Sequence, residues 1–280
     1  MLVSDWSYRI GINIASRAMR SMMRAKGVPG VFSVGTNVTF YEHQGIRLIY
    51  DYSRFGVAGN IDSGGTTEEA TRAKLGEILN GCRVFYDIGA HEGLFSIDVK
   101  KRAPATLVYA FEPQAKVLFK NLSLNNIHDV RIHQTAVGQC SGIVHMTTNR
   151  RSSNHILASG VSAENVFPVA TIDSLVTDGF EPPDIMKLDI EGYEFQALIG
   201  ARNTLLNHQP LIITEINHCF LRYHNGLLEF INYMTKMGYE IRCLQKGTLV
   251  RCTAVDDLAS LLPSDDSNYW WVSPRWAAAV

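Results

Sequence analysis

The sequence predicts a doubly wound α/β fold, in which a mostly parallel sheet carries helices on both faces. From residue 83 to the end of the chain, short β-branched or aromatic runs alternate seven times with segments of helical character, as is typical of such sheets. The chain has 280 residues and is 46% hydrophobic, which is enough apolar mass for a large core. The predicted strands cover residues 84–88, 107–111, 130–137, 184–190, 211–216, 239–244 and 269–272, and the predicted helices cover 94–102, 115–125, 193–206 and 227–237.

The first 80 residues precede this alternation, and we expect them to form an N-terminal elaboration of a domain at 81–280. Basic side chains among isoleucines and methionines at 1–30 predict an amphipathic helix. Such a helix packs on its own domain, or binds an anionic membrane or a partner. Apolar and polar residues alternate at 31–58 and are interrupted by Gln44 and Gly45, which predicts a β-hairpin.

Charge and cysteine content limit the function classes. The 26 basic and 27 acidic side chains leave a formal charge of -1, which disfavours a nucleic-acid partner. The five cysteines form an odd set with no C-x-x-C pair, so neither a disulfide framework nor a thiolate zinc site is expected. No apolar run is long enough for a transmembrane segment, and the N-terminus lacks the features of a signal peptide. We therefore expect a cytoplasmic protein.

A glycine turn follows the first predicted strand of the domain. Gly89 allows a tight turn and Gly93 allows the next helix to begin close to a ligand, which in open α/β sheets binds at the carboxyl ends of the strands. The segment lacks the G-x-G-x-x-G pattern of dinucleotide sites. Asp87 stands two residues before Gly89, where its carboxylate would repel phosphate and attract a cation such as S-adenosylmethionine. An aspartate beside a glycine is also a common turn former.

A second acid ends the next predicted strand. Glu112 is followed by Pro113, which turns the chain away. A carboxylate at this offset accepts hydrogen bonds from a ribose diol, as in NAD sites, so Glu112 indicates a nucleoside rather than a particular reaction. The small residues around Ala136 come after the third strand, at the height where an adenine edge would need backbone groups.

Three charged residues mark the fourth predicted strand. Strand alternation places Lys187 on the same face as Asp189, and a lysine in a central strand is costly to bury unless a carboxylate pairs with it. Asp189 and Glu191 are within reach. We weigh a structural ion pair about equally with a direct catalytic role. His218, just after the fifth strand, is a further candidate at the same sheet edge.

From about residue 84 to residue 217 the chain resembles the FkbM-type methyltransferases. Three ordered motifs carry the resemblance: D-x-G-A-x-x-G-x-x-S at Asp87, Gly89, Ala90, Gly93 and Ser96, F-E-P at Phe111, Glu112 and Pro113, and K-x-D-x-E-G-x-E at Lys187, Asp189, Glu191, Gly192 and Glu194. The resemblance implies a Rossmann-like seven-stranded sheet, S-adenosylmethionine as cofactor, and methylation of hydroxyl groups on sugars and natural products. One departure is His91-Glu92, where the family often has Asn and a small or apolar residue; it bears on how the methionine end is held.

Methyl transfer to a hydroxyl needs a base that removes the hydroxyl proton. Asp189, Glu191 and His218 are the candidates, and Lys187 would tune the acids or stabilise a developing alkoxide. A magnesium ion held by oxygen ligands at the strand ends is a second possibility, which we place behind the metal-free mechanism. Its ligands would be Asp189, Glu215 and Asn217.

Two other classes stay open. An NAD-linked oxidoreductase would share Glu112 but should show G-x-G-x-x-G. A non-catalytic adenosyl-binding protein would bind the cofactor without turnover, and the polar row at Lys187, Asp189 and Glu191 speaks against it. The expected partner is a small-molecule or glycan acceptor, and a homodimer is left open. No N/D-P-P-Y/F run follows the fourth strand. This absence argues against methylation of amino groups on nucleic-acid bases.

Overall fold

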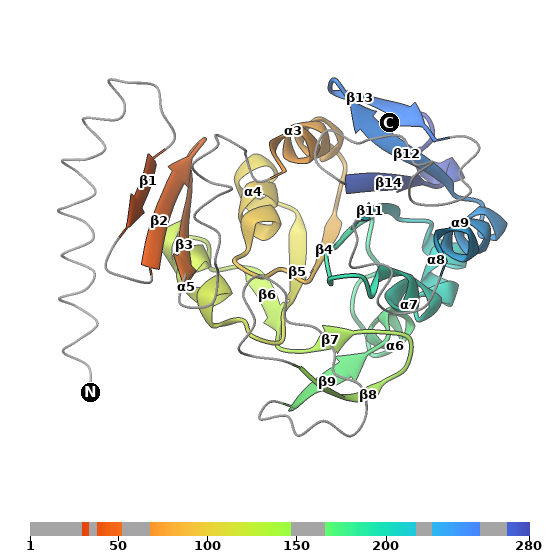
Figure 1. Cartoon of the computed structure of the whole chain (residues 1–280), viewed down its shortest axis with the longest axis horizontal. Coiled ribbons are helices and arrows are strands. Elements are labelled where there is room, and N and C mark those ends of the chain that lie inside the picture. Colours follow the sequence, from red (N-terminus) through yellow and green to blue (C-terminus); the bar gives the residue numbers. More distant parts are fainter. Residues whose placement is uncertain (1–29, 34–37, 52–67, 147–165, 217–225, 253–267) are drawn as a thin grey trace.

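The computed structural model describes most of the α/β domain and part of the N-terminal region (Figure 1). The described residues are 30–33, 38–51, 68–146, 166–216, 226–252 and 268–280. The helix predicted within residues 1–30 lies outside them, except for its last residue, and so do His218 and Asn217.

The main sheet has eight strands in the order β13-β12-β14-β11-β10-β4-β5-β6. Five neighbours, from β6 to β11, pair in parallel. At the other edge β14 pairs antiparallel with β11, and β12 and β13 continue in antiparallel pairs. The bounds are β4 Val84–Ile88, β5 Leu107–Phe111, β6 Val130–His133, β10 Ile185–Leu188, β11 Leu211–Glu215, β12 Glu240–Gln245, β13 Thr248–Arg251 and β14 Asn268–Val272.

The mostly parallel sheet with helices on both faces is therefore confirmed, but the count of seven strands is corrected to eight. The additional strand, β13, forms a hairpin with β12 through Lys246 and Gly247, both at positive φ. Its four residues are half-buried or exposed, so they lack the apolar run that made the other strands recognisable. The strand predicted at 130–137 is two strands, because β7 (Ala136–Val137) leaves the main sheet to pair with β9 (Val166–Ala170).

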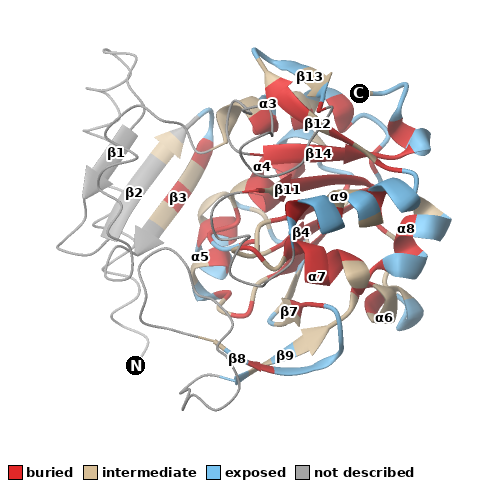
Figure 2. Cartoon of the chain, turned by 45° about the vertical axis from the view of Figure 1, so that its right-hand side comes forward, coloured by how far each residue is buried: buried red, intermediate tan, exposed pale blue. Residues whose placement is uncertain are grey.

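Helices cover both faces of the main sheet, and each face has its own hydrophobic cluster (Figure 2). On one face α3 and α4 pack against the sheet through Leu75 and Phe95. On the other face α6, α7, α8 and α9 pack through residues such as Phe195 and Phe230. The bounds are α3 Glu69–Ile78, α4 Leu94–Arg102, α5 Lys116–Leu124, α6 Ile172–Thr177, α7 Glu194–Ile199, α8 Arg202–His208, α9 Leu227–Lys236 and the 3-10 helix Pro274–Trp276. None of the helices in the described part of the chain is long and apolar enough to cross a membrane.

A three-stranded antiparallel sheet precedes α3 and lies beside α5 (Figure 1). It consists of β1 (Gly30–Ser33), β2 (Val38–His43) and β3 (Ile46–Asp51), and β2 and β3 form the hairpin expected around Gln44 and Gly45. The backbone of β3 is hydrogen-bonded by the side-chain amides of Asn121 on α5 and of Asn125, which directly follows α5. Asn121 also donates to the carbonyl of Glu92 at 2.9 Å, so one buried side chain connects the N-terminal sheet with the glycine turn.

Candidate active site

A pocket opens at the carboxyl ends of β4, β5 and β10, bordered by β7 and by residues that follow the strands. It encloses about 860 Å³ of empty space, part of it open to solvent. It is lined by Gly89, His91, Phe111, Glu112, Pro113, Thr135, Ala136, Val137, Met146, Asp189, Ile190, Glu191 and Tyr193. Acidic groups, a histidine and apolar side chains therefore face one cavity at the edge where α/β sheets bind ligands.

The turn after β4 is held close to the turn after β10. Gly89 has φ of 78°, and a Cβ at this position would collide with the carbonyl oxygen of Asp189. Its backbone N–H donates to the carbonyl of Phe111 at 2.9 Å. Glycine is thus needed both for the left-handed conformation and for the close approach of the two turns.

Asp87 and Ser96 lie beneath the turn rather than among the lining residues. Asp87 is only 2% exposed, and its Oδ2 accepts hydrogen bonds from the Ser96 N–H at 2.9 Å and the Ser96 hydroxyl at 2.5 Å. Burial raises the pKa of Asp87 to about 6, against the lowering effects of Ser96 and Lys187. This pair fixes the start of α4 relative to β4, and so supports the turn from below.

Glu112 faces the pocket directly after β5. Its Oε2 accepts the N–H of His91 at 3.1 Å, and its Oε1 accepts the N–H of Gln114 at 2.8 Å. A carboxylate oxygen has two lone pairs, so each oxygen retains capacity for a ligand hydroxyl. These backbone bonds hold the carboxylate at the pocket wall.

Lys187 is buried in β10 between two carboxylates. The exposed fraction of its side chain is 1%, and its Nζ lies 3.2 Å from Asp189 Oδ2 and 3.2 Å from Glu68 Oε1. Burial lowers the pKa of Lys187, but the attraction of Asp189, Glu68 and Glu215 outweighs burial and raises the pKa above its ordinary value. Lys187 is therefore a permanent cation that orients Asp189 at the pocket wall.

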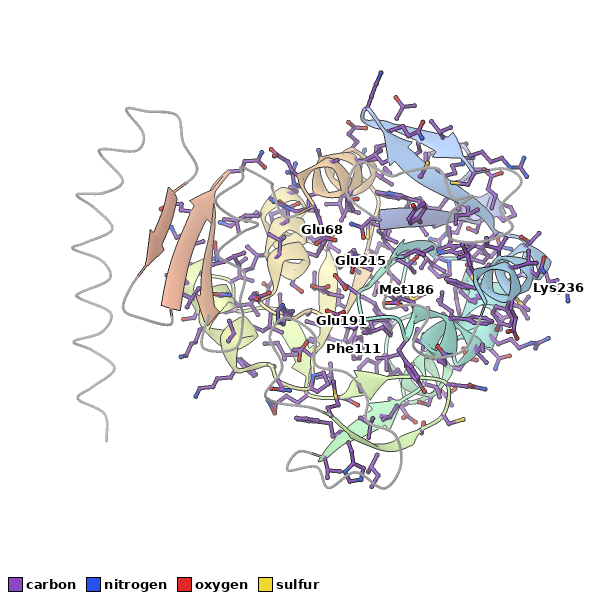
Figure 3. All side chains as sticks on the ribbon, in the orientation of Figure 1. Glu68, Phe111, Met186, Glu191, Glu215 and Lys236 are labelled. Carbon is purple, nitrogen blue, oxygen red and sulfur yellow. The ribbon has the colours of Figure 1, made fainter. Side chains whose placement is uncertain are left out.

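Glu68 is a site residue that the sequence analysis missed. It immediately precedes α3, has φ of 51° and accepts a hydrogen bond from Asn268 on β14 at 2.7 Å. Burial raises the pKa of Glu68, Asp189 raises it further, and Lys187 and Asn268 lower it. Figure 3 labels Glu68 together with Glu215 and Glu191, which come from three different parts of the chain. No local motif marks Glu68, since its partner Lys187 is far away in the sequence.

The turn after β10 brings Glu191 to the pocket. Glu191 and Gly192 both have positive φ, of 58° and 100°. The turn is held from within by Glu194, whose Oε1 accepts the N–H of Ile190 at 2.9 Å and of Gly192 at 3.3 Å. Burial raises the pKa of Glu194 to about 7. Glu194 thus supports the turn, while Glu191 lines the cavity.

The structure brings together only part of the predicted set. The predicted residues that line the pocket are Gly89, Glu112, Pro113, Ala136, Asp189 and Glu191, and those that support it without lining it are Asp87, Ala90, Gly93, Ser96 and Lys187. His91, Tyr193 and Met146 also line the pocket but were not among the predicted site residues. Among the described residues, no group of three His, Cys, Asp or Glu side chains is arranged to hold a metal ion.

A model of the methyltransferase FkbM domain matches residues 87–241, which span the glycine turn, Glu112 and the Lys187 strand. The chain belongs to the FkbM methyltransferase family. No curated protein matches the chain.

Solved methyltransferases are similar to this FkbM family member at low sequence identity. Methyltransferase FkbM from Methylobacillus flagellatus KT is 18% identical over 68% of this chain, with a TM-score of 0.44. M. jannaschii TYW2, solved in complex with AdoMet, is 17% identical over 86% of both chains, with a TM-score of 0.42. Precorrin-6y C5,15-methyltransferase from Geobacter metallireducens GS-15 is 12% identical over 78% of this chain and 91% of its own, with a TM-score of 0.40. The present chain spans 43% of the length of the Methylobacillus protein.

Proposed function

We propose that this protein is an S-adenosylmethionine-dependent methyltransferase that methylates a hydroxyl group of a sugar or another natural product. The observation that carries the proposal is the position of Glu112, which lines the same pocket as Asp189 within a chain of the FkbM family. The finer assignment, to oxygen rather than nitrogen or carbon, follows from the family resemblance of the three motifs.

The residues that line the pocket support this choice of cofactor. Glu112 would accept hydrogen bonds from the ribose hydroxyls. Phe111 and Val137 supply apolar surface for a base, and Ala136 brings backbone groups to the same wall. Asp189 and Glu191 would face the positively charged methionine end, since opposite charges favour each other in a partly buried site.

The residues of this chain would align the acceptor and take its proton. The bound cofactor supplies an electrophilic methyl group on a sulfonium. Asp189 is fixed by Lys187, and Glu191 projects from the adjacent turn. A carboxylate at either position would accept the hydroxyl proton as the acceptor oxygen bonds to the methyl carbon and the carbon–sulfur bond breaks, with S-adenosylhomocysteine as the leaving group. His218 stays a third candidate for this role, outside the described residues.

Methyl transfer from labelled S-adenosylmethionine to a panel of glycans and polyketides tests the proposal. Asp189→Asn and Glu191→Gln should keep their fold and still bind the cofactor, although more weakly where the lost carboxylate faces the methionine end, and at least one should lose turnover at saturating cofactor by roughly 10²–10⁴-fold. Glu229→Gln, an exposed change on α9, is the matched control. Cofactor binding with no transfer to any acceptor would favour a non-catalytic adenosyl-binding protein, and NAD binding in place of S-adenosylmethionine would favour an oxidoreductase.

A further inference from the structure

His91 occupies an unusual place in the glycine turn. It adopts φ of 48°, a conformation that most residues other than glycine avoid but that Asn, Asp and His tolerate best. Its backbone N–H donates to Glu112, and its Nδ1 forms an ion pair with Glu92 Oε2. The imidazole is 47% exposed and lines the pocket, so it remains accessible to a ligand while Glu92 holds it.

Carboxylates from three elements surround this imidazole. Partial loss of hydration lowers the pKa of His91, but Glu92 in the same turn, Glu112 after β5 and Asp189 after β10 outweigh this loss and raise the pKa to about 9. Glu191 lines the same cavity. The imidazole is therefore protonated at neutral pH, and Glu92 holds it through Nδ1.

The charge of the pocket is otherwise negative. Of the lining residues that the structure describes, Glu112, Asp189 and Glu191 are acidic and His91 alone is basic. S-adenosylmethionine carries a single anionic group, the carboxylate of its methionine part. That carboxylate would be repelled by the acidic residues unless a cation accompanies it.

We propose that the imidazolium of His91, held by Glu92, binds the methionine carboxylate of the cofactor. This inference rests on the proposed function, because it concerns the same pocket and the same cofactor. It gives the His91-Glu92 pair a ligand-binding role in addition to shaping the turn. His91 then sets specificity for nucleoside ligands that carry a complete amino acid.

Two ligands that differ only by the carboxylate isolate this contact. S-adenosylhomocysteine carries the carboxylate, and 5′-(3-aminopropylthio)-5′-deoxyadenosine is the same molecule without it. Titration calorimetry would compare both ligands on the wild type and on His91→Asn, which keeps a residue suited to positive φ but removes the charge. We expect His91→Asn to weaken S-adenosylhomocysteine binding roughly 10–100-fold, the range for a charged hydrogen bond, and to leave the carboxylate-free ligand within about twofold.

Each other outcome overturns a specific statement. Equal weakening of both ligands, or no weakening of either, would show that His91 only shapes the turn. Failure of the wild type to bind either ligand would instead overturn the proposed function, and this proposal with it. Glu92→Gln is the second variant if His91→Asn does not fold, and it should selectively weaken S-adenosylhomocysteine because it removes the group that holds and charges the imidazole.

Discussion

The Nζ of Lys187 lies 3.2 Å from Oε1 of Glu68 and so connects the middle of the sheet with the residue that precedes α3. The same ammonium also contacts Asp189. Two carboxylates, one directly before α3 and one directly after β10, therefore share one buried cation. This arrangement makes the position of Asp189 depend on a residue that lies well outside the methyltransferase motifs.

Removing both carboxylates should cost more than the two single changes together. Glu68→Gln or Asp189→Asn alone leaves Lys187 with one adjacent carboxylate. The double variant leaves a buried ammonium with neither, and we expect a loss of unfolding free energy of roughly 3 kcal/mol or more. Urea unfolding of the four proteins measures the coupling. Strictly additive effects would mean that the two acids hold Lys187 independently.

Glu112→Gln should lower affinity for S-adenosylhomocysteine about tenfold or more, because it would remove the proposed charged contact to two ribose hydroxyls, at a cost of ~1–3 kcal/mol. The substitution retains one oxygen that can accept the backbone N–H groups of the turn. Calorimetry measures the affinity, and the melting temperature checks the fold. Unchanged affinity in a folded variant would place the ribose elsewhere.

The stability of the protein should depend on the protonation of Glu194. Its pKa rises from 4.5 to about 7 on folding, so the folded state binds this proton more tightly than the unfolded state. The resulting stabilisation is present below pH 4.5 and is lost as the pH rises through about 7. Glu194→Gln mimics the protonated form and should gain stability relative to the wild type between pH 5 and pH 9, by roughly 1–3 kcal/mol.

Melting curves at several pH values measure this difference. Glu229→Gln, an exposed acid changed in the same way, serves as the control. If the difference in stability between Glu194→Gln and the wild type is the same at every pH, the pKa of Glu194 does not change on folding.

Methyl transfer should survive metal chelation. The described residues offer no group of three metal-binding side chains, and Lys187 occupies one side of Asp189. We expect activity in EDTA to stay within about twofold of the untreated enzyme, because a carboxylate base needs no Lewis acid. If EDTA abolishes activity and magnesium restores it, the result would support a magnesium site with Asp189, Glu215 and Asn217 as ligands.

The sheet and its ligand-binding edge could be predicted because their signals are local. The apolar runs of β4, β5, β10 and β11 and the glycine turn are continuous in sequence, and the parallel pairing then places Asp87 opposite Lys187. The departure of β7 from the main sheet depends on its pairing with β9, which is distant in sequence. β13 follows β12 directly, but it is short and half-buried and so has no apolar run to mark it.

The candidate site residues also fall into two groups: those that the local sequence predicts and those that it does not. Glu112 and Asp189 follow their strands directly, so their position at the pocket could be predicted. Glu68 could not, because its role depends on a contact with Lys187 across the fold. The position of Asp87 at the end of β4 could be predicted, but the direction of its side chain could not. Ser96 binds the carboxylate and keeps it beneath the turn.

The carboxamide of Asn121 is a hydrogen-bonding partner shared by the N-terminal sheet and the glycine turn. It receives the N–H of Ile49 on β3 at 2.7 Å and donates to the carbonyl of Glu92 in the turn at 2.9 Å. We expect order that a ligand imposes on the turn to reach β3 through this side chain, and by linkage a change at β3 would then alter ligand affinity by the same factor. None of the described residues of the N-terminal sheet lines the cavity, so its effect on the pocket would be indirect.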